Sequence, residues 1–233
     1  MYDSDLELAR LQAEALYLHD PHGRLLRVNE PDPQDPVPRF LLIRTRHGNL
    51  WRTRHDLPAD LAAALDGLAA DEPVGADLAT PPAHLAVYTD LLGRHAPLCA
   101  PNAGPAYYLP DLAAPPGTVT ITPANAELLR AHYPTTLSEL AERAPVVVCV
   151  ADGVAVAACS CARTTARVAE AGIHTVEAYR GRGYAVATAR GWAAAVRTQG
   201  KLPLYSTSWD NTASQAVAAR LGAVLYGVDF SLT

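Results

Sequence analysis

The segment Val176–Ala185 constrains the fold of this chain more than any other stretch. Its sequence, Val-Glu-Ala-Tyr-Arg-Gly-Arg-Gly-Tyr-Ala, follows a predicted strand at 168–176 and opens a predicted helix at 183–198. Such a junction leaves several backbone N–H groups unpaired and pointing one way, and the helix dipole adds positive potential there. Gly181 and Gly183 let the backbone approach an anion, which a Cβ would obstruct. The junction therefore predicts a pyrophosphate-binding turn.

Two common phosphate-binding motifs do not fit this turn. The dinucleotide fingerprint needs a third glycine where the chain has Val186, and no Gly-Lys-Ser/Thr follows for a Walker A loop. Taken alone, two glycines between a strand and a helix are also typical of an ordinary connection. Other sequence features are therefore needed to distinguish a pyrophosphate-binding turn from an ordinary connection between a strand and a helix.

The predicted order of elements over residues 118–233 is β-α-α-β-β-β-α-β-α-β. Hydrophobic periodicity and turn residues place the strands at 119–122, 146–151, 154–163, 168–176, 204–208 and 224–232, and the helices at 123–131, 136–143, 183–198 and 211–221.

The first hundred residues predict a small α+β region without a catalytic motif. Its expected helices are 5–18, 58–70 and 80–92, its strands 25–28, 40–46 and 50–53, and a loop with four prolines at 30–38 interrupts it. The proline-rich stretch 97–117 is the best boundary. We therefore predict a region 1–100 of unknown role and a second domain at 101–233.

Two motifs in register resemble those of the GNAT (GCN5-related) N-acetyltransferases. Arg180-x-x-Gly183-x-Ala185 is similar to the family's Gln/Arg-x-x-Gly-x-Gly/Ala motif. The segment Tyr205–Ser214 with Arg220-Leu-Gly222 looks like the next motif, a strand, an asparagine-led helix and a closing Leu-Gly. The resemblance covers roughly residues 118–233. It implies an α/β (α+β) fold, the GNAT acyl-CoA N-acyltransferase fold with a central mixed sheet flanked by helices, preceded by the small N-terminal region.

The resemblance also implies a co-substrate, acetyl-coenzyme A (acetyl-CoA), and no metal. The strand ending at Val176 would pair with the pantetheine arm and splay from the strand at 204–208, and an N–H near Val176 would face the thioester oxygen. The residues implied in binding the co-substrate are Thr175, Val176, Arg180, Gly181, Arg182, Gly183, Tyr184, Ala185, Asn211 and Ser214.

Direct attack by an amine requires a base, and Glu170 is the first choice. It lies six residues before Val176, as the glutamate of histone-type family members does, and strand alternation puts it on one face with His174, the second choice. A salt-bridged strand carboxylate and a structural histidine are the competing interpretations. Many members carry a tyrosine as general acid where this chain has Ala218, so Tyr205, Ser214 or water would have to protonate the thiolate.

Composition excludes several other classes of function. The net charge is -5 and no basic stripe runs along the chain, which argues against nucleic acid. No apolar run approaches the roughly 20 residues of a membrane span, and the N-terminus lacks a secretory apolar segment, so we expect a cytoplasmic protein. The four cysteines form no CxxC pair, which argues against zinc.

The resemblance implies an acetyl-CoA-dependent N-acetyltransferase that moves an acetyl group to the primary amine of an unidentified acceptor. A non-catalytic acyl-CoA-binding or sensor module with the same scaffold is the alternative, and a scaffold that binds another protein is the third. The N-terminal region could form one wall of the acceptor site or the surface of a homodimer.

Overall fold

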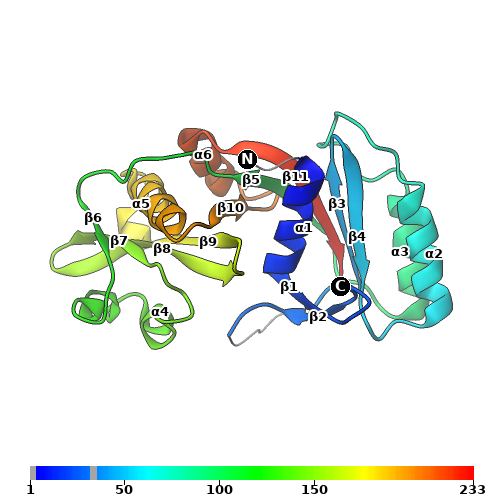
Figure 1. Ribbon diagram of the computed structural model, residues 1–233, viewed down its shortest axis with the longest axis horizontal. Coiled ribbons are helices and arrows are strands. Elements are labelled where there is room, and N and C mark those ends of the chain that lie inside the picture. The colour runs from blue at the N-terminus through cyan, green and yellow to red at the C-terminus, as the bar shows by residue number, and fades with distance from the viewer. Residues whose placement is uncertain (1–3, 32–35) are drawn as a thin grey trace. The chain divides into compact units, whose positions relative to one another are not determined.

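The computed structural model describes residues 4–31 and 36–233 of the chain (Figure 1). It divides into two compact units, Met1–Ala106 with Ser206–Asn211 and Leu225–Thr233, and Tyr107–Tyr205 with Thr212–Val224. The domain ranges 1–100 and 101–233 stay predictions. Part of the proline-rich loop at 30–38 lies outside the described residues.

The first unit contains a sheet with strands in the order β4-β3-β11, and each neighbouring pair is antiparallel. Its elements are α1 (Asp5–Leu16), β1 (Tyr17–His19), β2 (Leu25–Val28), β3 (Phe40–Thr45), β4 (Gly48–Thr53), α2 (Ala59–Ala70), α3 (Leu85–His95) and β11 (Val224–Leu232). Alternate side chains of β3 pack on opposite faces of the sheet. Leu41 and Ile43 pack with α1 residues, whereas Phe40 and Leu42 pack with residues of α2 and α3.

The second unit contains a mixed sheet in the order β10-β9-β8-β7-β6. Its elements are β6 (Thr118–Thr120), η1 (Ala126–Leu129), α4 (Pro134–Ser138), β7 (Val147–Ala151), β8 (Val154–Thr164), β9 (Val168–Thr175), η2 (Glu177–Tyr179), α5 (Tyr184–Thr198), β10 (Leu202–Ser206) and α6 (Thr212–Leu221). The β9–β10 pair is parallel, with α5 as the connection, and the remaining pairs are antiparallel. The expected mixed sheet flanked by helices is confirmed.

The helices α5 and α6 cover one face of this sheet, and η1 and α4 cover the other. Trp192 of α5 and Leu221 of α6 pack against inward residues of β8 and β9, including Cys159 and Ala171. Leu129 of η1 packs on the opposite face with residues of β7 and β8. Cys159 and Cys161 of β8 are free thiols and are buried in the α5 cluster.

Most expected elements appear with ends shifted by a few residues, but two strands were not expected: β1, where the helix expected at 5–18 ends early, and a strand in the proline-rich stretch. The proline-rich stretch 97–117 contains β5 (Asn102–Tyr108). Its carbonyl groups accept hydrogen bonds from the chain after β10, from Thr207 N–H to Pro105 O at 3.3 Å and from Trp209 N–H to Ala103 O at 3.0 Å. Pro105 is tolerated because its carbonyl, and not an N–H, makes the bond.

Candidate functional site

The turn before α5 has the backbone geometry that its glycines allow. Gly181 and Gly183 adopt φ values of 76° and 83°, and space is open where a Cβ would stand at either position. Gly183 is also the N-cap of α5 and has no side chain to accept from the first-turn amides. Because the first N–H groups of a helix lack partners within it, the turn presents donors to an anion.

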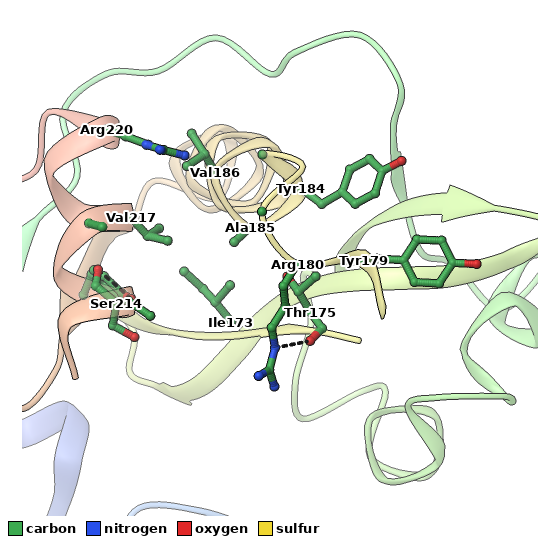
Figure 2. Close-up of a pocket in the computed structure, with 15 residues that line it drawn as sticks. Ile173, Thr175, Tyr179, Arg180, Tyr184, Ala185, Val186, Ser214, Val217 and Arg220 are labelled. Carbon is green, nitrogen blue, oxygen red and sulfur yellow. Dashed lines mark hydrogen bonds between the residues drawn. The ribbon is translucent and has the colours of Figure 1, made fainter. Parts of the chain in front are cut away.

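A cavity of about 290 Å³ adjoins this turn inside the second unit (Figure 2). It is lined by Ile173, Thr175, Tyr179, Arg180, Gly181, Gly183, Tyr184, Ala185, Val186, Tyr205, Ala213, Ser214, Ala216, Val217 and Arg220. These residues come from β9, the turn, α5, β10 and α6. The lining contains two arginines and no carboxylate, and most of the rest is apolar. The cavity therefore suits a ligand with an apolar arm and an anionic group.

The parallel pairing of β9 with β10 covers only three residues of each strand, and its last pair is Glu170 with Leu204. Beyond that pair β9 continues to Thr175. The N–H of Val176 donates to Val156 O at 2.9 Å, so it completes the pairing with β8 and does not face a ligand. Because N–H groups alternate along a strand, those of Ile173 and Thr175 point to the side that β10 leaves open.

Arg180 lies at the same edge of β9. Its Nε donates to Thr175 O at 3.4 Å, which holds the guanidinium beside the strand end (Figure 2). Arg182 points elsewhere: its guanidinium stacks 5.1 Å from the Tyr179 ring centre, and it is not among the lining residues. Its side chain is thus outside the cavity, although the backbone of residues 182–185 forms the turn.

Glu170 is buried at the base of the opening between β9 and β10, with 2% of its surface exposed. Strand alternation places its side chain on the face of β9 opposite to Ile173 and Thr175, the side chains that line the cavity. The role of Glu170 as base stays a prediction.

His174 shares this face but lies at an exposed position. Its ring contacts Tyr133 edge to face, with ring centres 5.6 Å apart, and its carbonyl accepts from the Tyr133 hydroxyl at 3.1 Å. These contacts anchor the strand end to the helical layer and fit a structural histidine as well as a base.

Tyr205 lines the cavity, and its hydroxyl donates to Ser214 O at 3.4 Å. Burial, followed by the nearby charge of Glu170 among the lesser causes, raises the pKa of Tyr205. A phenol with a raised pKa keeps its proton at neutral pH and gives it up less readily. Ala218, where many family members have tyrosine, is packed in the core cluster with Trp192.

The α6 face is the part of the site that sequence reasoning missed. Ala213, Ala216, Val217 and Arg220 recur at helical spacing and line the cavity beside Val186 of α5 (Figure 2). The same spacing is visible in the sequence, but it also fits a helix that merely packs on a sheet. Asn211 directly precedes α6, belongs to the first unit and is not among the cavity-lining residues.

Two absences concern residues 4–31 and 36–233, the described part of the chain. No group of three or more His, Cys, Asp or Glu side chains in that range is arranged to hold a metal ion. No helix in the same range is long and apolar enough to cross a membrane.

Comparison with known families finds one match. The model of the GNAT acetyltransferase family matches residues 135–226, which include the strands β7 to β10, the glycine turn, α5 and all of α6. A sequence search of curated proteins finds no match.

Solved structures with a similar backbone are distant in sequence. One, described as a GNAT-family acetyltransferase of Novosphingobium aromaticivorans, is 18% identical with a TM-score of 0.48 and covers 58% of this chain and 65% of its own. A GCN5-related N-acetyltransferase-like protein of Streptococcus suis is 17% identical with a TM-score of 0.48, covering 88% and 87%. A GNAT-family acetyltransferase of Colwellia psychrerythraea is 14% identical with a TM-score of 0.47, covering 100% and 98%. At such values these likenesses carry no conclusion about function.

Proposed function

Because residues 135–226 of this chain match the model of the GNAT acetyltransferase family, we propose that it is an acetyl-CoA-dependent N-acetyltransferase acting on a primary amine. The family supports acyl transfer in general. The observation that carries the finer proposal is the uncapped turn at Gly181 and Gly183, which opens on a cavity containing two arginines and no carboxylate. A cytoplasmic location and a homodimer stay predictions.

The parts of coenzyme A match the parts of the cavity. The pyrophosphate would accept from the first-turn amides of α5, where the helix dipole also favours negative charge. Arg180 and Arg220 would add cationic groups for the phosphates. The pantetheine arm would lie along Ile173 and Thr175, where its amides replace the strand partner that β9 lacks beyond Glu170.

The reaction needs no covalent enzyme intermediate. The neutral amine attacks the thioester carbon, a C–N bond forms, and charge develops on the carbonyl oxygen, which the Thr175 N–H would stabilise. The C–S bond then breaks and coenzyme A leaves as a thiolate. The proton lost by the amine goes to Glu170, and the thiolate takes a proton from Tyr205 or from water.

A non-catalytic acyl-CoA sensor is the second candidate. Two observations favour it: Ala218 is packed in the core where many family members have a tyrosine, and burial raises the pKa of Tyr205, its nearest replacement. Release of coenzyme A from acetyl-CoA in the presence of a panel of amines separates the two candidates. Turnover with any amine supports the enzyme, whereas tight binding without turnover supports the sensor.

Acetyl-CoA binding to two glycine variants tests the site itself. Gly183→Val should weaken binding at least tenfold, or about 1.4 kcal/mol, because it adds a branched side chain at a left-handed position where the phosphate approaches. Gly200→Val is the matched control, since Gly200 has φ 73° and equally open surroundings but is not a cavity-lining residue. Calorimetry that finds equal affinity in both folded variants would remove the turn from the site.

A further inference from the structure

A buried arginine ends an apolar row in the sheet of the first unit. Phe40, Leu42 and Arg44 alternate on one face of β3, and the first two belong to the core cluster beneath α2 and α3. Arg44 pairs with Val228 of β11 and is only 7% exposed. Burying a guanidinium is costly unless its charge and its donors are satisfied.

The hydrogen bonds of Arg44 use only some of its N–H donors. Nη1 donates to Thr80 O, Nη2 donates to Asp77 O at 3.4 Å, and the buried Nε has no hydrogen-bond partner. Among the described residues no carboxylate lies within ion-pair distance of Arg44. The Asp77 carboxylate instead accepts from Thr80 Oγ1 at 2.6 Å and from Ala79 N–H at 3.1 Å.

Arg39, the other buried arginine of the same strand region, makes more hydrogen bonds than Arg44. It is 3% exposed. Its two terminal nitrogens donate to four backbone carbonyls, those of Leu92, Ala96, Pro97 and Thr233. Arg44 has only two such bonds, so it retains capacity for another acceptor.

Arg44 also lines a cavity of about 150 Å³ that lies wholly in the first unit. Its other walls are mainly apolar and include Leu78, Leu85, Val228 and Phe230. Trp209, which is 38% exposed, completes the lining. Arg44 is the only charged side chain among the lining residues.

We propose that this cavity binds a small carboxylate whose apolar body is about the size of a benzene ring. In another protein, an engineered apolar cavity of about 150 Å³ takes up benzene, which sets the scale of the body. The carboxylate supplies a counter-charge in direct contact with Arg44 and accepts from its terminal nitrogens, Nη1 and Nη2, each of which donates only one of its two N–H groups to Thr80 O or Asp77 O. The site is separate from the coenzyme A cavity, because the two share no lining residue.

Calorimetry on the full chain with benzoate and benzamide tests the proposal. The two probes have the same shape and differ in charge, so benzoate should bind one to one and benzamide at least tenfold more weakly. A change in Trp209 fluorescence on adding benzoate, lost in Trp209→Phe, should locate the site. Absence of saturable benzoate binding, or equal affinity for benzamide, overturns the proposal whatever the variants do.

Variants then assign the charge and separate this site from the proposed acetyltransferase site. Arg44→Gln should lower benzoate affinity at least tenfold, whereas Arg46→Gln, at an exposed position on the same chain segment, should leave it unchanged. Benzoate should bind Gly183→Val normally, since that glycine belongs to the other cavity. Equal losses in the Arg44 and Arg46 variants, or loss of benzoate binding in Gly183→Val, contradict the site.

Discussion

Among single residues, Glu170 is the one on which the proposed chemistry depends most. It is buried at the last residue pair before β9 and β10 part, and its side chain lies on the strand face opposite to the residues of β9 that line the cavity beside the glycine turn. Glu170→Gln keeps the size of the side chain but cannot take a proton. We expect kcat to fall by at least about 10² with acetyl-CoA affinity nearly unchanged, because positioned proton transfer contributes about that much. Steady-state kinetics and calorimetry measure the two quantities.

His174→Gln is the matched control, because His174 shares the strand face of Glu170 but is exposed and held by Tyr133. It should cost much less activity. The rise of the wild-type rate with pH should also disappear in Glu170→Gln and persist in His174→Gln. If the two variants behave in the opposite way, His174 is the base. If neither loses activity, the amine reaches the thioester already deprotonated.

The sequence could predict some of these residues and not others, for a physical reason. The turn at 180–185 is recognisable because its function lies in consecutive backbone groups, and glycine records their conformation directly. Arg220 and Val217 reach the same cavity only because α6 packs beside α5. The position of Val176 relative to the motif could be read from the sequence, but the direction of its N–H could not. That direction depends on which neighbouring strand Val176 pairs with.

At the level of elements, β5 shows why composition can mislead. Proline and glycine at 104–105 are typical of a loop, and the prediction placed a boundary there. In the structure a Cβ on Gly104 would stand 1.7 Å from Thr207 O, so the glycine is needed for two backbones to come close. A close approach of this kind depends on a segment a hundred residues away, which no local pattern reveals.

Two glycine-to-alanine variants should therefore have opposite effects on stability. Gly104→Ala should lower the free energy of unfolding by more than about 2 kcal/mol, because backbone must move to admit the Cβ. Gly67→Ala, at an exposed position inside α2 with nothing within 4 Å, should raise it by up to about 1 kcal/mol. Urea denaturation followed by circular dichroism measures both. A neutral Gly104→Ala would mean that β5 does not approach the 206–209 segment as described.

At the scale of the whole molecule, buried tyrosines should limit stability at alkaline pH. Burial raises the pKa of Tyr133 to about 12 from its ordinary value of 10.0. Because the unfolded chain loses this proton first, the free energy of unfolding should begin to fall near pH 10 and continue to fall until about pH 12. Burial also raises the pKa of Tyr107 and Tyr205, which adds to the same trend.

Tyr133→Phe isolates the contribution of that residue. The variant loses the hydrogen bond to His174 O, so it should be less stable than the parent at pH 8. Its stability should nevertheless fall less steeply between pH 9 and about pH 11, since one titrating group is gone. Denaturation midpoints across that range decide the matter, and parallel curves for the two proteins would show that Tyr133 does not titrate with unfolding.

The pairing of β3 with β11 affects how the first unit can fold during translation. Phe40 lies opposite Leu232, and Thr45 opposite Gly227, so the central strand of the first unit gains its second neighbour from residues translated almost two hundred positions later. A ribosome-bound nascent chain can form α1 and the β3–β4 hairpin early, but one edge of β3 has to wait. We expect the emerging N-terminal half to remain protease-sensitive and to need chaperone protection until the stretch after α6 has left the exit tunnel.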